Sequence, residues 1–431
     1  MFRRVVSQRG LRNSLRDGVW GGSLALGLTA FCGALAFAQA ADIQSARAPA
    51  AKVCLSASEA SCARTLAEAL DRVASGGEIL VHPGIYDTAD IHKSVTLHGL
   101  KGEEAPSIEP GLACMRIEAQ GSPIAVTMTG VNIGAAHLRG CIISNGAALA
   151  INEADIDSGA RLGHAIEIES GTLTLGAHKS DGYAVRLFGV GQVGVGLMIA
   201  PGARAEVYNV SISRFGIAID VQGELTAADS EFNFNNTGIR VKSLGPNAGG
   251  SAGLVKLSDL LFDTNRIGVL VERGSRATVE VAGGDFFGHA VGIDSAAPIK
   301  ISRVHLAENQ VAIQLAGQSI RSRGLNVKPA YELASLKFDS NTGSDLHIAS
   351  ALSGGFSLHA ATWSPALTNN VTIAANANLG DCRIDDTDLR TKNSPSGSSS
   401  GLRKLQAACA SGVGLTSSLA GQVKGSSSSQ Q

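Results

Sequence analysis

Short runs of alternating apolar and polar residues recur between residues 202 and 316. Two of the clearest are TVEVAG at 278–283 and PIKISR at 298–303. Apolar residues two positions apart are typical of a β-strand, whereas a helix would place them three and four positions apart. The pattern therefore predicts short strands joined by turns and argues against an all-helical solenoid.

Five of these segments can be aligned, and each column of the alignment has one physical character. Small residues fill one column, apolar residues the next, and small or polar residues the column three positions earlier. The three columns are Gly216, Gly238, Gly268, Gly292 and Ala312; Ile217, Ile239, Val269, Ile293 and Ile313; and Ser213, Asn235, Asn265, His289 and Asn309. Successive members of the first column are 22, 30, 24 and 20 residues apart, and the longest interval contains the insertion LGPNAGGSAG. Repeats of this length predict a solenoid, and their strand period predicts a parallel β-helix.

The columns also predict what holds neighbouring coils together. We expect each strand to pair with its equivalent in the next coil, and stacked amides in the asparagine column to bond the coils above and below. The glycine column is expected to supply backbone angles that other residues resist. His289 stands in the asparagine column, so we interpret it as a turn residue rather than a catalytic base.

Composition sets limits on the class of protein. The chain has 431 residues and a formal net charge of −1, with both signs mixed along it. A nucleic-acid-binding protein would normally show a basic face, so that class is not expected. The 52 glycines and 4% aromatic residues favour turns and tight stacking. One continuous solenoid is compatible with this length because its core grows along a line.

The first 40 residues have the pattern of a secretory signal peptide. Residues 1–18 carry five arginines and one acid, 21–38 are small and apolar, and AFAQAA offers a cleavage point near Ala38 or Ala40. An uncleaved membrane anchor is the alternative, and the Arg3–Arg4 pair leaves a twin-arginine signal open. After cleavage no transmembrane segment is expected, so the protein should be periplasmic or extracellular.

Cysteine usage agrees with export. Cys32 would leave with the signal peptide, and six cysteines would remain. Six cysteines allow fifteen connectivities. Their grouping favours three local disulfides: Cys54 with Cys62, Cys114 with Cys141, and Cys382 with Cys409. Free buried thiols are the alternative for some of them, and none has the CxxC or Cys/His spacing of a zinc site.

The segment that begins at Arg64 places an amphipathic helix before a Gly-Gly turn, an Ile-Leu-Val strand, Pro-Gly-x-Tyr and a Val-Thr-Leu strand. It resembles the first coil of right-handed parallel β-helix proteins of the pectin-lyase-like superfamily, in which a helix plugs the open end of the solenoid. The resemblance implies an all-β, right-handed parallel β-helix over 63–380 with a capping helix at 65–75. A segment over 41–62 would precede it, and a Cys-pinned, low-complexity Ser/Gly-rich tail over 381–431 would follow it, with one short helical stretch, LRKLQAACA.

The same resemblance leaves the activity open. Members of that superfamily include polysaccharide lyases, hydrolases and mannuronan epimerases, and also non-catalytic adhesins and matrix proteins. The chain lacks the Asp-Pro-His-Asp of the epimerases, the Asn-Thr-Asp, Asp-Asp and His-Gly set of polygalacturonases, and the Arg-x-Pro-x-x-Arg of pectate lyases. A shared fold does not confer a shared reaction.

The alignment nevertheless predicts one outward face on which acids and bases gather. Its successive coils contribute Asp229 and Glu231, Asp259 and Leu261, Gly283 and Asp285, and Arg303 and His305. Because coils stack about 4.8 Å apart, these side chains should be neighbours. Asp229, Glu231 and Asp259 are candidate calcium ligands, and Asp259, Asp285, Arg303 and His305 are candidate catalytic residues. The alternative is an ordinary solvated strand face.

Two functions of different classes follow. The first is an exported, non-catalytic β-helix that binds or organises envelope or extracellular polysaccharide. The second is a polysaccharide lyase or C5-epimerase that acts on an acidic polymer through the Asp/Arg/His face. After signal cleavage the chain retains one tryptophan and four tyrosines, so a deep aromatic sugar cleft is not expected. An acidic polymer, the expected kind of partner, could instead be held by Arg, Lys and calcium along a shallow groove.

Overall fold

The computed structural model describes residues 52–100, 102, 104–109, 113–134, 141–159, 163–178, 183–242, 253–317, 330–352, 355–364, 367, 370–375, 377, 379, 381–385 and 405–410. The chain divides into two units, 1–48 and 49–431, and every described residue belongs to the second. The expected signal peptide over 1–40, and the expected tail apart from 381–385 and 405–410, therefore lie outside the described residues.

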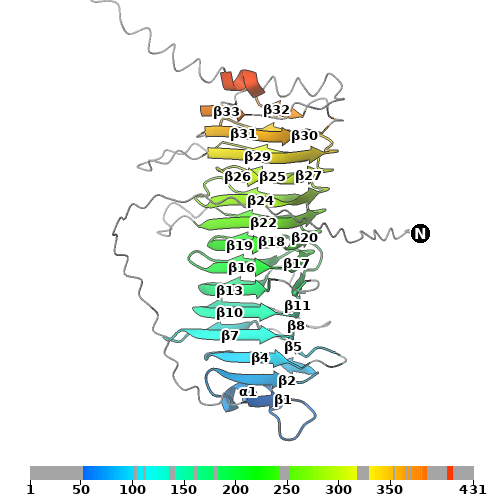
Figure 1. Cartoon of the computed structure of the whole chain (residues 1–431). Helices are drawn as coiled ribbons and strands as arrows, with labels where there is room; N and C mark the ends of the chain where they lie inside the picture. The colour runs from blue at the N-terminus through cyan, green and yellow to red at the C-terminus, as the bar shows by residue number, and fades with distance from the viewer. Residues whose placement is uncertain are drawn as a thin grey trace, which may run out of the picture. The chain divides into compact units, whose positions relative to one another are not determined.

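The described strands stack into three parallel ladders that run from coil to coil (Figure 1). The first ladder consists of β1 (Lys52–Leu55), β2 (Gly77–Val81), β4 (Val95–Gly99), β7 (Ile124–Thr129), β10 (Ala147–Asn152), β13 (Gly171–Gly176), β16 (Arg204–Tyr208), β19 (Glu224–Ala228), β22 (Leu254–Asp263), β24 (Thr278–Phe287), β26 (Lys300–Ser302), β29 (Ala330–Asp339), β31 (Gly355–Thr362) and β33 (Asp381–Asp385).

The second ladder follows the first in each coil, and the third ladder follows the second. The second consists of β3 (Ile85–Asp87), β5 (Ser107–Glu109), β8 (Asn132–Ile133), β11 (Ala154–Asp157), β14 (Val185–Phe188), β17 (Val210–Ser213), β20 (Glu231–Asn233), the later halves of β22, β24, β29 and β31, and β27 (His305–Ala307). The third consists of β6 (Met115–Glu118), β9 (Ile142–Asn145), β12 (His164–Ile168), β15 (Val195–Ile199), β18 (Ile217–Val221), β21 (Thr237–Val241), β23 (Ile267–Val271), β25 (Val291–Ser295), β28 (Val311–Leu315), β30 (Ser344–Ile348) and β32 (Val371–Ile373). This architecture confirms the prediction of a parallel β-solenoid.

The solenoid strands extend beyond the expected limits of 63 and 380. β1 already pairs with β2 in parallel, and β33 pairs with β31. β1 is short, and a loop closed by a disulfide separates it from α1 (Leu66–Arg72). The alternation of apolar and polar residues is therefore too brief at β1 to be recognised in the sequence. The helix expected over 65–75 is present and shorter. Thr65 Oγ1 accepts a hydrogen bond from the Glu68 N–H, and the Glu68 carboxylate accepts one from the Arg64 N–H, a reciprocal cap that fixes where the helix begins.

The core is a continuous column of apolar side chains inside the coils. Phe232, Phe262 and Phe286 are fully buried, and their rings stack with centroids 5.0 and 4.4 Å apart. The glycine column makes room for these rings. A Cβ at Gly238 would lie 2.8 Å from the Phe262 ring, and one at Gly268 would lie 2.8 Å from the Phe286 ring. A residue with a side chain could not pack there without displacing the stack.

The expectation that the glycine column supplies unusual backbone angles is wrong. Positive φ values occur instead in the turns, and at the two corners that flank the second ladder most of the residues that have them are not glycine. One corner, between the first and second ladders, holds Asp229, Asp259, Gly283 and Arg303; the other, after the second ladder, holds Phe234, Thr264, Gly288 and Glu308. The corners are stabilised because their N–H groups bond to the next coil, as the Asp229 N–H does to the Ser258 carbonyl.

The asparagine column forms the expected ladder of buried amides. The Asn235 N–H donates to Asn265 Oδ1 and the Asn309 N–H donates to Asn341 Oδ1, at 2.8 and 2.9 Å. Each asparagine also donates from Nδ2 to a carbonyl of the preceding coil. His289 takes one rung, as expected, and Asp345 ends the ladder by accepting from Asn341 Nδ2 at 2.8 Å.

The register of the first aligned segment differs from the expected one by two residues. Ile219 pairs with Ile239, so the residue opposite Gly238 is Ala218 and not Gly216. The other four members of the column are in the register we expected. A shift of two leaves every strand residue on the same face of its sheet, so the sorting of inward and outward positions was not affected within the strands.

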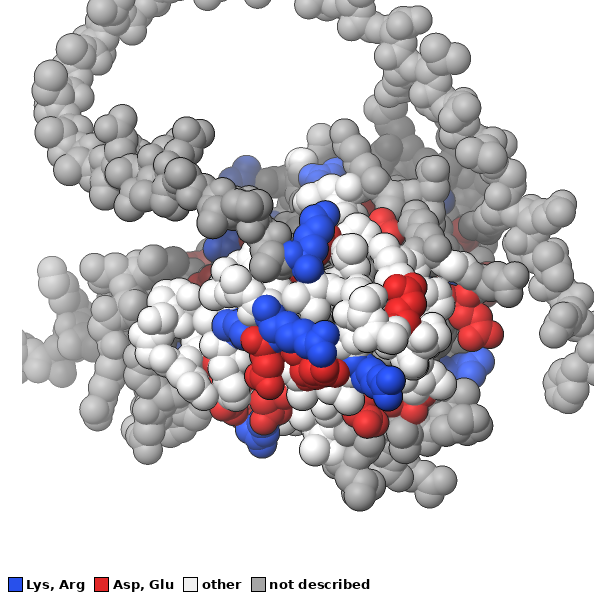
Figure 2. All heavy atoms as spheres, turned by 90° about the horizontal axis from the view of Figure 1, so that it is seen from below, with Lys and Arg blue, Asp and Glu red and all other residues white. Residues whose placement is uncertain are grey.

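The three expected disulfides are present: Cys54–Cys62, Cys114–Cys141 and Cys382–Cys409. The last one ties a short helix over 405–410 to β33, with Leu405 buried in the core. Three disulfides are typical of an oxidising, exported environment. No helix in the described part of the chain is both long and apolar enough to cross a bilayer. Figure 2 looks onto the face near α1 and β1, where basic and acidic side chains lie side by side.

Candidate functional site

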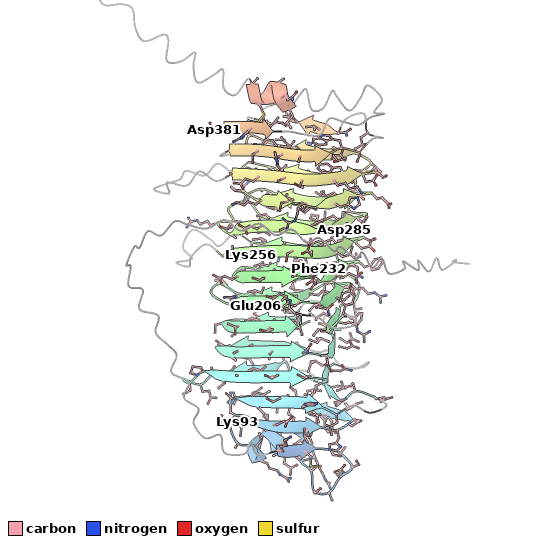
Figure 3. All side chains as sticks on the ribbon, viewed as in Figure 1. Lys93, Glu206, Phe232, Lys256, Asp285 and Asp381 are labelled. Atoms are coloured by element: carbon pink, nitrogen blue, oxygen red, sulfur yellow. A yellow bond between two sulfur atoms is a disulfide. The ribbon has the colours of Figure 1, made fainter. Side chains whose placement is uncertain are left out.

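The predicted outward face exists on the second ladder, where one side chain from each coil lies in register with the next. We call this set the outer row. From β11 onward it comprises Asp155, Arg186, Ser211, Glu231, Leu261, Asp285, His305, Lys337 and Thr362. The outer row contains acidic, basic and neutral residues in no regular order. Asp285 points away from the core at the level of β24 (Figure 3).

Near the C-terminal end of the outer row, the side chains of Asp285 and His305 contact each other across two neighbouring coils. Asp285 Oδ1 lies 3.1 Å from His305 Nδ1, and the Phe287 ring packs edge-on to the imidazole at 5.5 Å. His305 Nε2 is buried and has no hydrogen-bond partner among the described residues. Nδ1 is engaged by the carboxylate and Nε2 is covered, so neither ring nitrogen is open to a substrate in this arrangement. The pair is placed to hold two coils together.

Asp259 and Arg303 do not join this pair. Both lie at the positive-φ corner before the second ladder, with φ of 52° and 55°, and both are exposed. Gly283 occupies the same corner in the coil between them, so they are two coils apart, about 10 Å along the stack. The positive φ reverses the alternation of faces at this corner, so Asp259 and Arg303 are not members of the outer row. The structure thus brings together two of the four expected catalytic residues.

The three expected calcium ligands occupy two kinds of position. Asp229 and Asp259 are exposed corner residues, whereas Glu231 belongs to the outer row. The Glu231 carboxylate already accepts a hydrogen bond from Asn233 Nδ2 at 2.9 Å and one from the Tyr183 hydroxyl. Burial, and then this contact with Glu231, raise the pKa of Tyr183. These acids do not form a group close enough to share an ion; within the described ranges Cys54, Glu59 and Cys62 form the one such group.

A groove lies over the second ladder in the first coils, outside the segments aligned from sequence. Its volume is about 530 Å³, and β3, β5, β8, β11 and β14 or the turns beside them supply its walls. The lining residues are Gly84, Ile85, Glu104, Ala105, Ser107, Asn132, Gly134, Asp155, Asp157 and Phe188. The sequence signal that could have found it is the outer row itself, because Asp155 and Arg186 continue that row toward the N-terminus.

The groove combines fixed polar groups with exposed apolar surface. Asn132 Oδ1 accepts a hydrogen bond from the Asp155 N–H at 2.9 Å, and Arg186 binds both oxygens of the Asp155 carboxylate. The Arg186 guanidinium also lies 5.9 Å from the centre of the Phe188 ring. Ile85 is 66% exposed.

The acids of the groove differ in their environments. Burial raises the pKa of Asp157, whose carboxyl group has no ion pair among the described residues. Asp155 is matched by Arg186, and Glu104 is exposed. The described lining can therefore donate and accept hydrogen bonds and carries more carboxylates than cations.

No protein-family model matches this chain, and neither the curated proteins nor the solved structures include a match to it.

Proposed function

We propose that this chain is an exported β-solenoid that binds polysaccharide without catalysis, and that the groove over β3, β5, β8, β11 and β14 is its binding site. The right-handed coil and the kinship with the pectin-lyase-like superfamily expected from the first coil are part of this proposal. The observation that carries it is the groove, a shallow hollow of about 530 Å³ in which carboxylate and amide groups lie beside apolar surface.

The chemistry of a sugar ring fits such a lining. A pyranose presents hydroxyl groups around its rim and C–H groups on its faces, so it requires polar groups beside an apolar platform. Asn132 and Asp157 offer the polar groups, and Ile85 and Phe188 offer the platform. Each coil adds a further position along the stack, which suits a polymer better than a single small sugar.

The charge of the lining favours a class of polymer other than the acidic one expected from sequence. Glu104, Asp155 and Asp157 are acids, and the nearby Arg186 is committed to Asp155. A uronate carboxylate would meet like charge in this lining, whereas a neutral or amine-bearing glycan would not. We therefore propose a neutral or amine-bearing polysaccharide as the ligand.

Binding of soluble neutral, amine-bearing and uronate polymers, measured by isothermal titration calorimetry, tests this function. We expect Phe188→Ala and Asp157→Asn to weaken binding, each by about 1–3 kcal/mol, the range for a well-buried contact. Asp285→Ala is the matched control, since it removes an outer-row acid outside the groove, and it should bind as the parent does. Equal binding by the Phe188→Ala and parent proteins would remove the groove from the function.

The Asp285–His305 contact favours one second candidate, a lyase or C5-epimerase that acts on an acidic polymer. A carboxylate and an imidazole in contact can exchange a proton with a sugar carbon if His305 turns outward. Such an enzyme would release unsaturated uronates, seen by their ultraviolet absorbance, or would exchange the C5 proton with solvent. Turnover by the parent protein and none by Asp285→Ala would establish this activity in place of the first.

A further inference from the structure

We propose that the first coil contains a redox-controlled zinc site made of Cys54, Cys62, Glu59 and His82. The disulfide form would exclude the metal, and the dithiol form would bind it. The proposal is independent of the polysaccharide groove, which none of these four residues lines.

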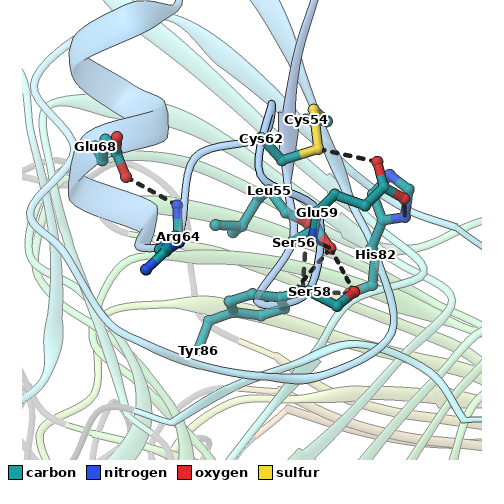
Figure 4. Close-up of a disulfide and its surroundings, with 10 residues drawn as sticks. All are labelled: Cys54, Leu55, Ser56, Ser58, Glu59, Cys62, Arg64, Glu68, His82 and Tyr86. Atoms are coloured by element: carbon teal, nitrogen blue, oxygen red, sulfur yellow. Dashed lines mark hydrogen bonds and ion pairs between the residues drawn. A yellow bond between two sulfur atoms is a disulfide. The ribbon is translucent and has the colours of Figure 1, made fainter.

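Four side chains that can bind metal meet at this disulfide (Figure 4). The Cys62 Sγ atom lies 3.4 Å from Glu59 Oε2, and the other carboxylate oxygen, Oε1, lies 3.5 Å from His82 Nδ1. The ligand atoms of Cys54, Glu59 and Cys62 all lie within 4.8 Å of one another. Ligands on a tetrahedral zinc ion, bound at about 2.0–2.3 Å, are separated by about 3.3–3.8 Å. Side-chain rotations would bring the ligand atoms of the four residues to these separations.

The donor atoms match zinc better than other common ions. Two thiolates, one imidazole nitrogen and one carboxylate oxygen form a four-coordinate set of the kind that zinc accepts. Calcium and magnesium prefer oxygen donors alone. No familiar spacing marks this site in the sequence, because the cysteines are eight residues apart and His82 follows the next strand, β2.

The framework that holds the four side chains does not depend on the disulfide. Ser56 Oγ accepts hydrogen bonds from the Ser58 and Glu59 N–H groups, both at 3.3 Å, which shapes the loop. The Cys62 N–H donates to the Glu59 carbonyl at 3.1 Å, and the His82 N–H donates to the Leu55 carbonyl at 3.0 Å.

Two further contacts tie β1 to the rest of the first coil. The Ala63 N–H donates to the Cys54 carbonyl at 2.9 Å, and the buried Tyr86 hydroxyl lies 2.9 Å from the His82 carbonyl. These bonds persist when the S–S bond is cleaved, so the thiols should stay close to Glu59 and His82.

Reduction of the disulfide and binding of zinc are two successive steps. A dithiol reductant attacks the Cys54–Cys62 disulfide, becomes a cyclic disulfide itself, and leaves two thiols on the protein. Zinc then binds both sulfurs as thiolates, and their two protons pass to solvent. Glu59, 3.4 Å from Cys62 Sγ, is placed to accept the first of these protons. A cyclic disulfide of the same kind reverses the sequence: it is reduced to the dithiol, the Cys54–Cys62 bond forms again, and the ion is released.

Cobalt titration of the mature chain tests the site, with Cys114, Cys141, Cys382 and Cys409 replaced by serine. The reduced protein should bind one Co²⁺ with the absorption bands of tetrahedral, thiolate-bound cobalt, and zinc should displace it. The oxidised protein should bind none. His82→Ala should weaken affinity at least about tenfold, which is the lower limit for loss of a group that supports a metal site. His98→Ala is the matched control, because His98 also faces an acid, Glu78, at 3.4 Å, but has no cysteine beside it.

Three results would overturn the proposal: a reduced protein that binds no cobalt, equal binding by the oxidised form, or unchanged affinity in His82→Ala. Circular dichroism checks whether the reduced protein keeps its β-sheet. If reduction abolishes the β-sheet signal and metal does not restore it, the site does not exist. A signal that returns with one equivalent of metal supports the proposal, because metal binding would then stabilise the first coil. Failure here leaves the sugar-binding test unaffected.

Discussion

Acid should weaken the solenoid through His289, the histidine that interrupts the asparagine ladder. Its side chain is 2% exposed, and its Nδ1 atom lies 3.1 Å from the backbone nitrogen of Asn265 and 2.9 Å from the Asn265 carbonyl oxygen. Burial lowers the pKa of His289 from its ordinary value of 6.5 to about 4, although hydrogen bonding to Asn265 and the charge of Asp263 partly oppose this. The folded protein therefore holds this imidazole neutral.

The sign and size of the effect follow from proton linkage. Between pH 6.5 and 4 the unfolded chain binds a proton at His289 and the folded chain does not, so stability falls as the pH falls. A pKa shift from 6.5 to about 4 corresponds to about 3 kcal/mol once the pH is below 4, and most of this is lost by about pH 4.5. Above pH 7 the residue contributes no pH dependence.

His289→Asn is the informative change, because asparagine occupies this rung in the neighbouring coils. Its Oδ1 would accept from the Asn265 N–H, as Asn265 Oδ1 does from the Asn235 N–H. Urea denaturation at pH 7.5 and 4.5 should show a loss of stability in the parent that exceeds the loss in the variant by about 2–3 kcal/mol. Hydrogen exchange at the Asn265 amide reports on the same coil if the coils unfold separately. Equal losses in parent and variant would refute the reasoning.

Two further predictions concern packing and charge. Asp220→Asn should cost about 2 kcal/mol or more in urea denaturation, because its carboxylate is 2% exposed and binds two cations. Asp155→Asn is its control and should cost less than about 1 kcal/mol, since that carboxylate is 37% exposed. Gly268→Ala should lower the melting temperature and cost about 1–3 kcal/mol, because the new Cβ would lie 2.5 Å from the Gly292 carbonyl oxygen and 2.8 Å from the Phe286 ring. A melting temperature equal to that of the parent would contradict this account of the glycine column.

The repeat carried enough information to predict the ladders and the asparagine rungs. Each of these depends on a side-chain type that recurs at a fixed position. The role of Gly268 could not be predicted in the same way. A side chain is excluded there by the Phe286 ring of the next coil. The corner at Asp259 was also hidden, because a positive φ in an acidic residue reverses the alternation of faces without a marker in the sequence.

The candidate site was predicted in part for the same reason. Alignment within 202–316 placed Asp285 beside His305, and strand pairing confirms that register. It could not separate corner residues such as Arg303 from strand residues, and it did not reach the groove around Asp157. The meeting of Cys54 with His82 depends on how a loop folds back on the next strand, which no repeat encodes.

In the coils from β16 to β25, only the connection from the third ladder back to the first differs in its number of residues from coil to coil. From the start of the first-ladder strand to the start of the third-ladder strand is 13 residues at Arg204 to Ile217, at Glu224 to Thr237, at Leu254 to Ile267 and at Thr278 to Val291. The connection from the third ladder back to the first ranges from two residues after β18 to twelve after β21 and fourteen after β28. The positive-φ corners and the amide rungs are bonded to both neighbouring coils, so an added residue there would break contacts on two sides. The return connection already differs in length from coil to coil, which makes it the place where foreign loops could be grafted and where the protein could acquire new surface during evolution.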